Sequence, residues 1–430
     1  MLGRMSMRPD GYRDRVIDPV VDRLLGAVGA MSIEGPKWCG KTWTSLNHAN
    51  SVYFVSDPAG GFANRTVAEL DLSAALHGAR PHAIDEWQEV PGIWDAVRFE
   101  VDANPSVGRF LLTGSSTPSE GAVAHSGTGR IVHLRMRPMT LFESGESTGA
   151  VSLSALLDGE PVAPHASRLT LDELVSVVVR GGWPASLGRP LDVAMDLTES
   201  YLDGLARVDV SQVDGVRRDP AKVIALLRSL ARNTSTTVSL AAMRRDIAQA
   251  AGPELDIKTL GVYLGLLERL YVVERIPAWN PALRSPVKLR QAPKWMLVDP
   301  SLAVAGMQSS AESLKREPKT LGFLFESLMT RDLLVYAQQL RATVWHYRDD
   351  ADLEVDAILT LPNGSWVGVE VKLGYQQVDQ AASTLLRLRD KMTKAGDPAP
   401  AAMIVLVGVG GVAQQRDDGV IVIPADSLGP

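Results

Sequence analysis

Residues 33–42 have the residue types and spacing of a phosphate-binding loop, in which two glycines flank four residues and a lysine and a threonine follow. Gly35 and Gly40 let the backbone turn so that its N–H groups face a polyphosphate. Lys41 would place a positive charge at the terminal phosphate oxygens, and the Thr42 hydroxyl would hold Mg²⁺. A chance match in a strand-to-helix turn is the alternative, which the strand-like residues before the loop disfavour. We expect the whole loop to contact the nucleotide: Gly35, Pro36, Lys37, Trp38, Cys39, Gly40, Lys41 and Thr42.

Two adjacent carboxylates, Asp85 and Glu86, follow the short strand-like run 80–84. Asp85 would complete the Mg²⁺ coordination, usually through water, while Glu86 would orient and deprotonate the attacking water. The alternative is a solvated strand end or a helix cap. The distance from the phosphate-binding loop favours the catalytic interpretation.

The run 109–116 predicts a third buried strand that ends in hydroxyl side chains. Such a position suits a polar side chain that senses the terminal phosphate. Ser115 is the first candidate, followed by Thr113 and Ser116, and an ordinary strand-to-loop cap explains the pattern equally well.

Arginines near residue 130 could supply a positive charge to the transition state, in the same chain or in a neighbouring subunit. The candidates are Arg130, Arg135 and Arg137. We take Arg130 as the first choice, with a plain surface arginine as the alternative.

The order of these segments resembles the bacterial and archaeal AAA-type ATPases that carry a carboxyl-terminal DUF4143 domain. The resemblance implies an ATPase fold and ATP as the nucleotide, and would extend DUF4143 over residues 180–430. The matching segments are the phosphate-binding loop, Ile-Asp-Glu-Trp-Gln at 84–88, Leu-Leu-Thr-Gly-Ser-Ser at 111–116, Gly-Arg at 129–130, residues 135–143 and Gly-Gly-Trp-Pro at 181–184.

The carboxyl-terminal third places a second set of charged residues on strand-like runs. Glu370 and Lys372 are two residues apart and so share one face of a strand, and Asp356 lies on the preceding strand. Glu326, on a predicted long helix, could join them. The set resembles the PD-(D/E)xK nuclease motif, in which Asp356 and Glu370 would hold Mg²⁺ and Lys372 would position water or stabilise the developing charge. The alternative is a β-hairpin with solvent-facing charges.

The order of the strands and helices expected around these residues predicts an α/β chain with several domains. We expect a P-loop ATPase domain, a parallel sheet with helices on both faces, over residues 1–150, and a restriction-endonuclease-like α/β domain over 316–430. Residues 151–215 would form a linker and a helical lid. The stretch 144–168 could be an ordered crossing or a flexible linker.

Residues 216–315 predict a winged helix, with three short helices followed by two strands. Ser239 and Asp256 would cap the second and third helices, and residues 237–239 would form a short strand. Winged helices bind DNA or proteins. Within this segment, we expect phosphate contact from a basic run, with a solvated loop as the alternative. The run includes Arg284, Lys288, Arg290 and Lys294.

Composition narrows the class of protein. The 430 residues carry a net charge of −6, which argues against a general basic field for nucleic acid. A single cysteine, Cys39, allows no internal disulfide and predicts a reducing, cytoplasmic location. No stretch has the apolar length of a membrane span, and the start lacks a signal-peptide core.

The combined hypothesis is an ATPase whose nucleotide state controls a winged-helix and nuclease-like region acting on DNA or RNA. The alternative is an ATP-dependent regulatory switch whose carboxyl-terminal domain is a non-catalytic platform for a protein partner. The sequence leaves open whether the chain forms a homo-oligomer.

Overall fold

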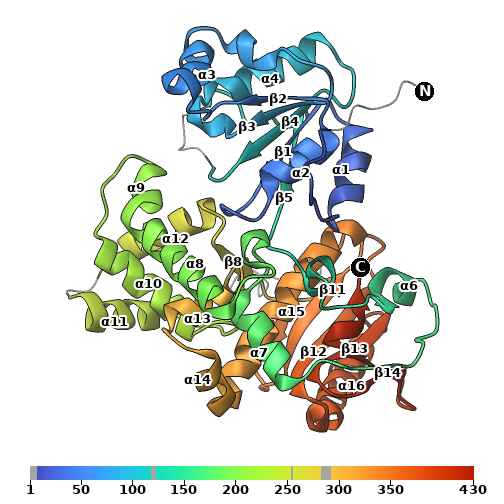
Figure 1. The fold of residues 1–430 in the computed structure, drawn as a ribbon. Helices are drawn as coiled ribbons and strands as arrows, with labels where there is room; N and C mark the ends of the chain where they lie inside the picture. Colours follow the sequence, from blue (N-terminus) through green and yellow to red (C-terminus); the bar gives the residue numbers. More distant parts are fainter. Residues whose placement is uncertain (1–6, 118–122, 253–254, 282–291) are drawn as a thin grey trace. The chain divides into compact units, whose positions relative to one another are not determined.

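The computed structural model describes residues 7–117, 123–252, 255–281 and 292–430 (Figure 1). These residues fall into two compact units. The first comprises residues 1–138 together with 208–218 and 265–272, and the second contains the rest of the chain. Of the helices that the structure describes, none is long and apolar enough to cross a membrane.

Within its described residues, the first unit is built on a parallel five-stranded sheet of order β2-β3-β4-β1-β5. This confirms the predicted parallel α/β architecture. Because β1 lies between β4 and β5, the loop that follows it opens at the carboxyl edge of the sheet, where α/β folds bind ligands. The strands are β1 (Ala30–Glu34), β2 (Ser51–Phe54), β3 (His82–Asp85), β4 (Phe110–Gly114) and β5 (Ile131–Arg135).

Helices complete the core of the first unit. Apolar side chains of the sheet, such as Ile84 and Phe110, are fully buried with Trp87 and Trp94, whose rings lie 4.7 Å apart. Burial of such aromatic rings is a main source of core stability. The helices are α1 (Asp18–Leu25), α2 (Lys41–His48), α3 (Ala59–Leu70), α4 (Gly92–Ala103) and the short α9 (Val210–Gln212).

The second unit contains most of the helical segment that the sequence predicts as a lid and a winged helix; residues 208–218 and 265–272 of that segment belong to the first unit. Ser239 accepts a hydrogen bond from the backbone N–H of Ala242, and Asp256 accepts one from Thr259, so both predicted caps are confirmed. The strand expected at 237–239 is wrong, because the pairing there is a single bridge between Thr236 and Trp295. The elements are α7 (Leu171–Arg180), α8 (Leu191–Gly204), α10 (Pro220–Arg232), α11 (Leu240–Ala251), α12 (Ile257–Arg269, whose last turn belongs to the first unit), β8 (Val273–Ile276), β9 (Lys294–Leu297), α13 (Pro300–Gly306) and α14 (Ala311–Arg316).

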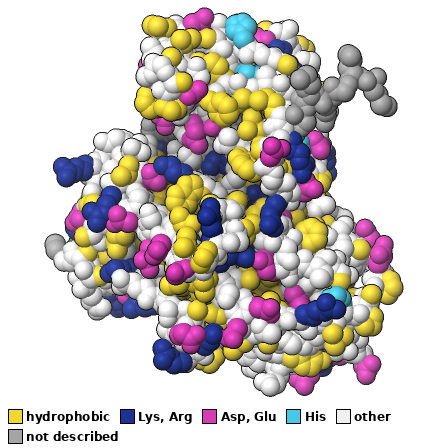
Figure 2. Space-filling view, viewed as in Figure 1, with side chains coloured by type: hydrophobic (Ala, Val, Ile, Leu, Met, Phe, Trp, Pro, Cys, Tyr) yellow, Lys and Arg dark blue, Asp and Glu magenta, His cyan; other side chains and the backbone are white. Residues whose placement is uncertain are grey.

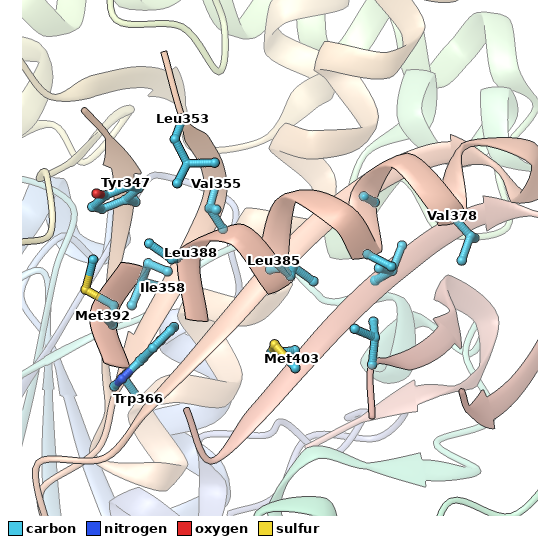
Figure 3. Close-up of a cluster of buried hydrophobic side chains, with 14 of the residues drawn as sticks. Tyr347, Leu353, Val355, Ile358, Trp366, Val378, Leu385, Leu388, Met392 and Met403 are labelled. Carbon is cyan, nitrogen blue, oxygen red and sulfur yellow. The ribbon is translucent and has the colours of Figure 1, made fainter. Parts of the chain in front are cut away.

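The carboxyl-terminal part of the second unit is a mixed sheet, seven-stranded over the described residues, with the order β10-β11-β12-β13-β15-β14-β7. Apolar side chains of α16, including Leu385 and Leu388, pack against Val355 and Met403 of the sheet (Figure 3). The elements are α15 (Pro318–Leu340), β10 (Thr343–Arg348), β11 (Glu354–Thr360), β12 (Trp366–Gly374), α16 (Val378–Lys394), β13 (Ala402–Val409), β14 (Val412–Gln415), β15 (Ile421–Pro424) and β16 (Leu428–Gly429).

The stretch 144–168 is an ordered crossing. After α5 (Leu141–Ser144), strand β6 (Val151–Ser152) pairs with β16. Helix α6 (Leu153–Leu157) follows, and β7 (His165–Ala166) then pairs with β14 at the end of the seven-stranded sheet. The Gly, Ser and Pro content that left this stretch undecided in the sequence therefore belongs to short strands and turns.

Candidate functional site

The phosphate-binding loop connects β1 to α2, and its backbone has the conformation that its residue types predict. Gly40, the residue before α2, has a φ of 104°, which favours glycine. Gly35 is required by close packing, since a Cβ there would lie 2.3 Å from the carbonyl oxygen of Met136. Lys41 is 5% exposed, and its Nζ donates to the Pro36 carbonyl at 2.9 Å. Its ammonium therefore lies over the loop.

The other loop residues differ in accessibility. Trp38 is half exposed, with a φ of 68°, whereas Cys39 is fully buried. Lys37 Nζ forms an ion pair with Asp209 at 2.7 Å. A buried thiol without access to solvent fits a packing role for Cys39.

Thr42, Asp85 and Thr113 form a hydrogen-bonded group at the carboxyl edge of the sheet. The hydroxyls of Thr42 and Thr113 donate to Asp85 Oδ1 at 2.8 and 2.6 Å. The pairing of β3 with β4 sets Asp85 opposite Thr113. Burial raises the pKa of Asp85, although these hydrogen bonds act in the opposite direction. The group brings together a hydroxyl and a carboxylate, which are oxygen ligands that suit Mg²⁺.

Glu86 lies next to this group in a left-handed conformation, with a φ of 57°. Ser115 donates to Glu86 Oε2 at 3.0 Å. The side-chain amide of Gln88 donates to the same oxygen and lies 3.5 Å from the Ser115 hydroxyl. The structure therefore brings the predicted base and the predicted sensing residue together. Gln88 was missed, although it stands two residues beyond Glu86.

Arg15 is a further residue that the sequence analysis did not single out. Its guanidinium donates to the carbonyls of Cys39 and Arg137, each at 2.8 Å, and the residue is 5% exposed. These bonds tie the phosphate-binding loop to the segment after β5. The signal for this structural role is that Arg15 is buried, and burial cannot be read from the sequence.

Arg130 does not lie at the nucleotide edge of its own sheet. The register of β1 with β5 pairs Ala30 with Ile131, so Arg130 stands at the amino end of the parallel strands, opposite the phosphate-binding loop. Its side chain is half exposed and pairs with Asp102 at 2.8 Å. The same-chain role is therefore wrong, and a role in a neighbouring subunit stays a prediction.

In the second unit the structure also brings together the four charged residues that the sequence singled out. Lys372 Nζ lies 2.5 Å from Glu370 Oε2 and 3.3 Å from Asp356 Oδ2. Burial and the Asp356 charge raise the pKa of both Glu370 and Glu326 to about 8. Burial alone would raise the pKa of Asp356, but the charges of the nearby lysines outweigh it and hold that pKa below its usual range.

Comparisons with protein-family models assign these regions. Residues 28–144 match the AAA domain. Residues 171–313 match a domain of unknown function, DUF8612, and residues 321–428 match a domain of unknown function, DUF4143. The chain carries an AAA domain and a DUF4143 domain. DUF4143 begins at residue 321 rather than near 180, and DUF8612 covers much of the stretch between.

Relatives of the whole chain are known from mycobacteria. Uncharacterized proteins of Mycobacterium tuberculosis and Mycobacterium bovis are each 24% identical over 418 residues, which is 94% of this chain and 82% of theirs. The Walker-type ATPase of Pyrococcus abyssi has a TM-score of 0.43 and 13% identity over 71% of this chain and 99% of its own. A TM-score this low carries no argument about the fold, so the assignment of the AAA domain rests on the family model that matches residues 28–144.

Lys294 is a fifth residue of this DUF4143 cluster, and its position changes the interpretation drawn from the sequence. Lys294 was expected in a basic loop that contacts phosphate, but it lies at the start of β9, 3% exposed, with its Nζ 2.9 Å from Glu326 Oε1. That expectation is wrong for Lys294. The other basic residues of the run, Arg284, Lys288 and Arg290, lie outside the described residues.

The surface charges are mixed in sign, in agreement with the small net charge of the chain. On the face shown in Figure 2, Lys and Arg side chains lie interspersed with Asp and Glu side chains. A nucleic-acid partner of the DUF4143 domain would therefore have to be argued from local contacts.

Proposed function

We propose that the AAA domain binds ATP with Mg²⁺ and hydrolyses it. The observation that carries this proposal is the convergence of Thr42, Asp85 and Glu86 beside the phosphate-binding loop. A hydroxyl and a carboxylate in contact suit a Mg²⁺ ion, and a second carboxylate one residue further on suits a base for water.

The residues of the site fit Mg²⁺-ATP. The Lys41 ammonium has a carbonyl of the loop itself as its partner, so it can exchange that bond for a phosphate oxygen without moving far. When bound, Mg²⁺ would neutralise charge on the phosphate oxygens. Glu86 would orient a water molecule and accept its proton, and Ser115 and Gln88 would hold the Glu86 carboxylate in place.

Two substitutions test the proposal. Glu86→Gln should keep ATP affinity and lower turnover by about 10²- to 10⁴-fold, the usual contribution of a general base. Lys41→Ala should weaken ATP binding by roughly 10- to 100-fold, because a hydrogen bond to a charged group contributes about 1.5–3 kcal/mol. Phosphate release and equilibrium binding of a fluorescent ATP analogue measure the two effects. Glu89→Gln, at an exposed position nearby, is the control; turnover at the wild-type rate by Glu86→Gln would contradict the role of Glu86.

For the carboxyl-terminal region we propose the second of the two sequence hypotheses, a non-catalytic platform whose state follows the nucleotide. The position of Lys294 among the DUF4143 carboxylates supports it over a nuclease. Incubation with Mg²⁺ or Mn²⁺ and single- or double-stranded DNA or RNA tests this choice. Cleavage that Lys372→Ala abolishes while ATPase activity persists would favour the nuclease instead.

A further inference from the structure

The carboxylate cluster of the DUF4143 domain is held by two lysines that approach Asp356 from different elements. Lys372 of β12 contacts Asp356 Oδ2, and Lys294 of β9 faces Asp356 Oδ1 at 3.9 Å. Lys294 Nζ also lies 3.2 Å from Glu354 Oε1, in addition to its contact with Glu326. Asp356 thus has an ammonium group beside each of its oxygens.

The two lysine side chains differ in how easily they could move away from the carboxylate cluster. The side chain of Lys372 is 22% exposed, so it could turn towards solvent if another cation took its place. The side chain of Lys294 is 4% exposed and is fixed by three carboxylates. Three acidic side chains around its Nζ favour the ammonium form of Lys294 over the neutral amine.

A divalent metal does not fit beside such a group. Mg²⁺ and Mn²⁺ require several oxygen ligands close to the ion, and a buried ammonium that already occupies those oxygens repels the ion strongly. Across the residues that the structure describes, no three His, Cys, Asp or Glu side chains are grouped to hold a metal, and the carboxyl groups of Glu326, Glu354 and Asp356 are instead arranged around the Lys294 ammonium. Access is not the obstacle, because Glu326, Glu354 and Asp356 line a pocket of about 940 Å³.

We propose that Lys294 is the resident counter-ion of this cluster and takes the place that a catalytic metal would need. The cation comes from the segment matched by DUF8612, while its three carboxylate partners belong to the segment matched by DUF4143. The lysine therefore joins the two family segments through charge, and the cluster is a structural centre rather than a nuclease site. This inference is independent of ATP hydrolysis by the AAA domain.

Titration of the full, nucleotide-free chain with Mn²⁺, followed by electron paramagnetic resonance, tests the proposal. The wild-type chain should show no saturable binding that depends on Asp356. Lys294→Met should bind Mn²⁺ at least about 100-fold more tightly, since removal of an adjacent like charge in a buried site is a large effect. Lys294→Arg, which keeps the charge, should behave as wild type, and Lys294→Met combined with Asp356→Asn should lose the new site.

Two results would overturn the proposal. One is saturable Mn²⁺ binding by the wild-type chain that Asp356→Asn abolishes and Thr42→Ala leaves intact. That comparison does not use a Lys294 variant and so decides the question even if Lys294→Met does not fold. The other is a folded Lys294→Met chain, with wild-type circular dichroism, that binds no more Mn²⁺ than the wild type.

Discussion

The Ser115 hydroxyl donates a 3.0 Å hydrogen bond to Glu86 Oε2, which links the end of β4 to the residue that follows β3. Because the two strands are neighbours in the sheet, the bond fixes the carboxylate relative to the phosphate-binding loop. In the proposed mechanism Ser115 would act on the attacking water through Glu86, whether or not it also senses phosphate.

Ser115→Ala should lower ATP turnover by roughly 10- to 100-fold with little change in ATP affinity, because a misplaced base loses catalytic efficiency. Ser116→Ala is the matched control, since Ser116 is the neighbouring hydroxyl of the same run. Steady-state phosphate release and nucleotide binding separate the two effects. If Ser116→Ala is the variant that loses turnover, the sensing position has been assigned to the wrong serine.

The pH dependence of ATP turnover in a Thr113 variant tests whether Asp85 is a Mg²⁺ ligand. Thr113→Val removes one of the hydrogen bonds that lower the pKa of Asp85, so that pKa should rise further above its ordinary value. Because Asp85 must be ionised to hold Mg²⁺, the acidic limb of the profile of kcat/KM against pH should move to higher pH. Thr113→Ser keeps the hydroxyl and should restore the wild-type profile. An unchanged acidic limb in Thr113→Val would argue against Asp85 as the ligand.

Arg15 is expected to support both stability and nucleotide binding. Arg15→Met removes the donors to the Cys39 and Arg137 carbonyls, both of which then lack these partners in a buried place. We expect the free energy of unfolding to fall by about 2–4 kcal/mol. ATP binding should weaken as well, since the loop loses a support. Chemical denaturation and ATP titration measure the two quantities, and Arg23→Met on the exposed face of α1 is the control. Equal effects of the two substitutions would show that Arg15 has no special role.

The sequence predicted most of what depends on local pattern. The phosphate-binding loop, the carboxylates at the end of β3 and the hydroxyls at the end of β4 all follow from residue types at strand ends, because parallel strands bring their carboxyl ends to one edge. The convergence of Asp356, Glu370 and Lys372 follows in the same way from a period of two along adjacent strands.

The parts that escaped prediction depend on long-range placement. Arg15 reaches the carbonyl of a residue 122 positions away, and Lys294 enters a helix-and-strand cluster from a separate hairpin. No periodicity marks such contacts. A basic residue in a polar run has the same appearance in the sequence whether it faces solvent or a buried carboxylate, so Lys294 was assigned to a basic run that could contact phosphate. Arg130 was misplaced because only the strand register reveals which end of the sheet it occupies.

The raised pKa of Glu326 predicts how stability depends on pH. Burial and the charge of Asp356 raise its pKa from 4.5 to about 8 in the folded chain, so the folded state binds a proton that the unfolded state releases above about pH 4.5. The stabilisation is therefore complete below pH 4.5 and is lost as pH rises towards 8. Glu326→Gln removes this titration and should flatten the decline of Tm between pH 5 and pH 8. Glu312→Gln, at an exposed position on α14, should leave the decline unchanged. Differential scanning calorimetry across this range measures both profiles, and parallel profiles for Glu326→Gln and the wild type would show that Glu326 is ionised in the folded chain.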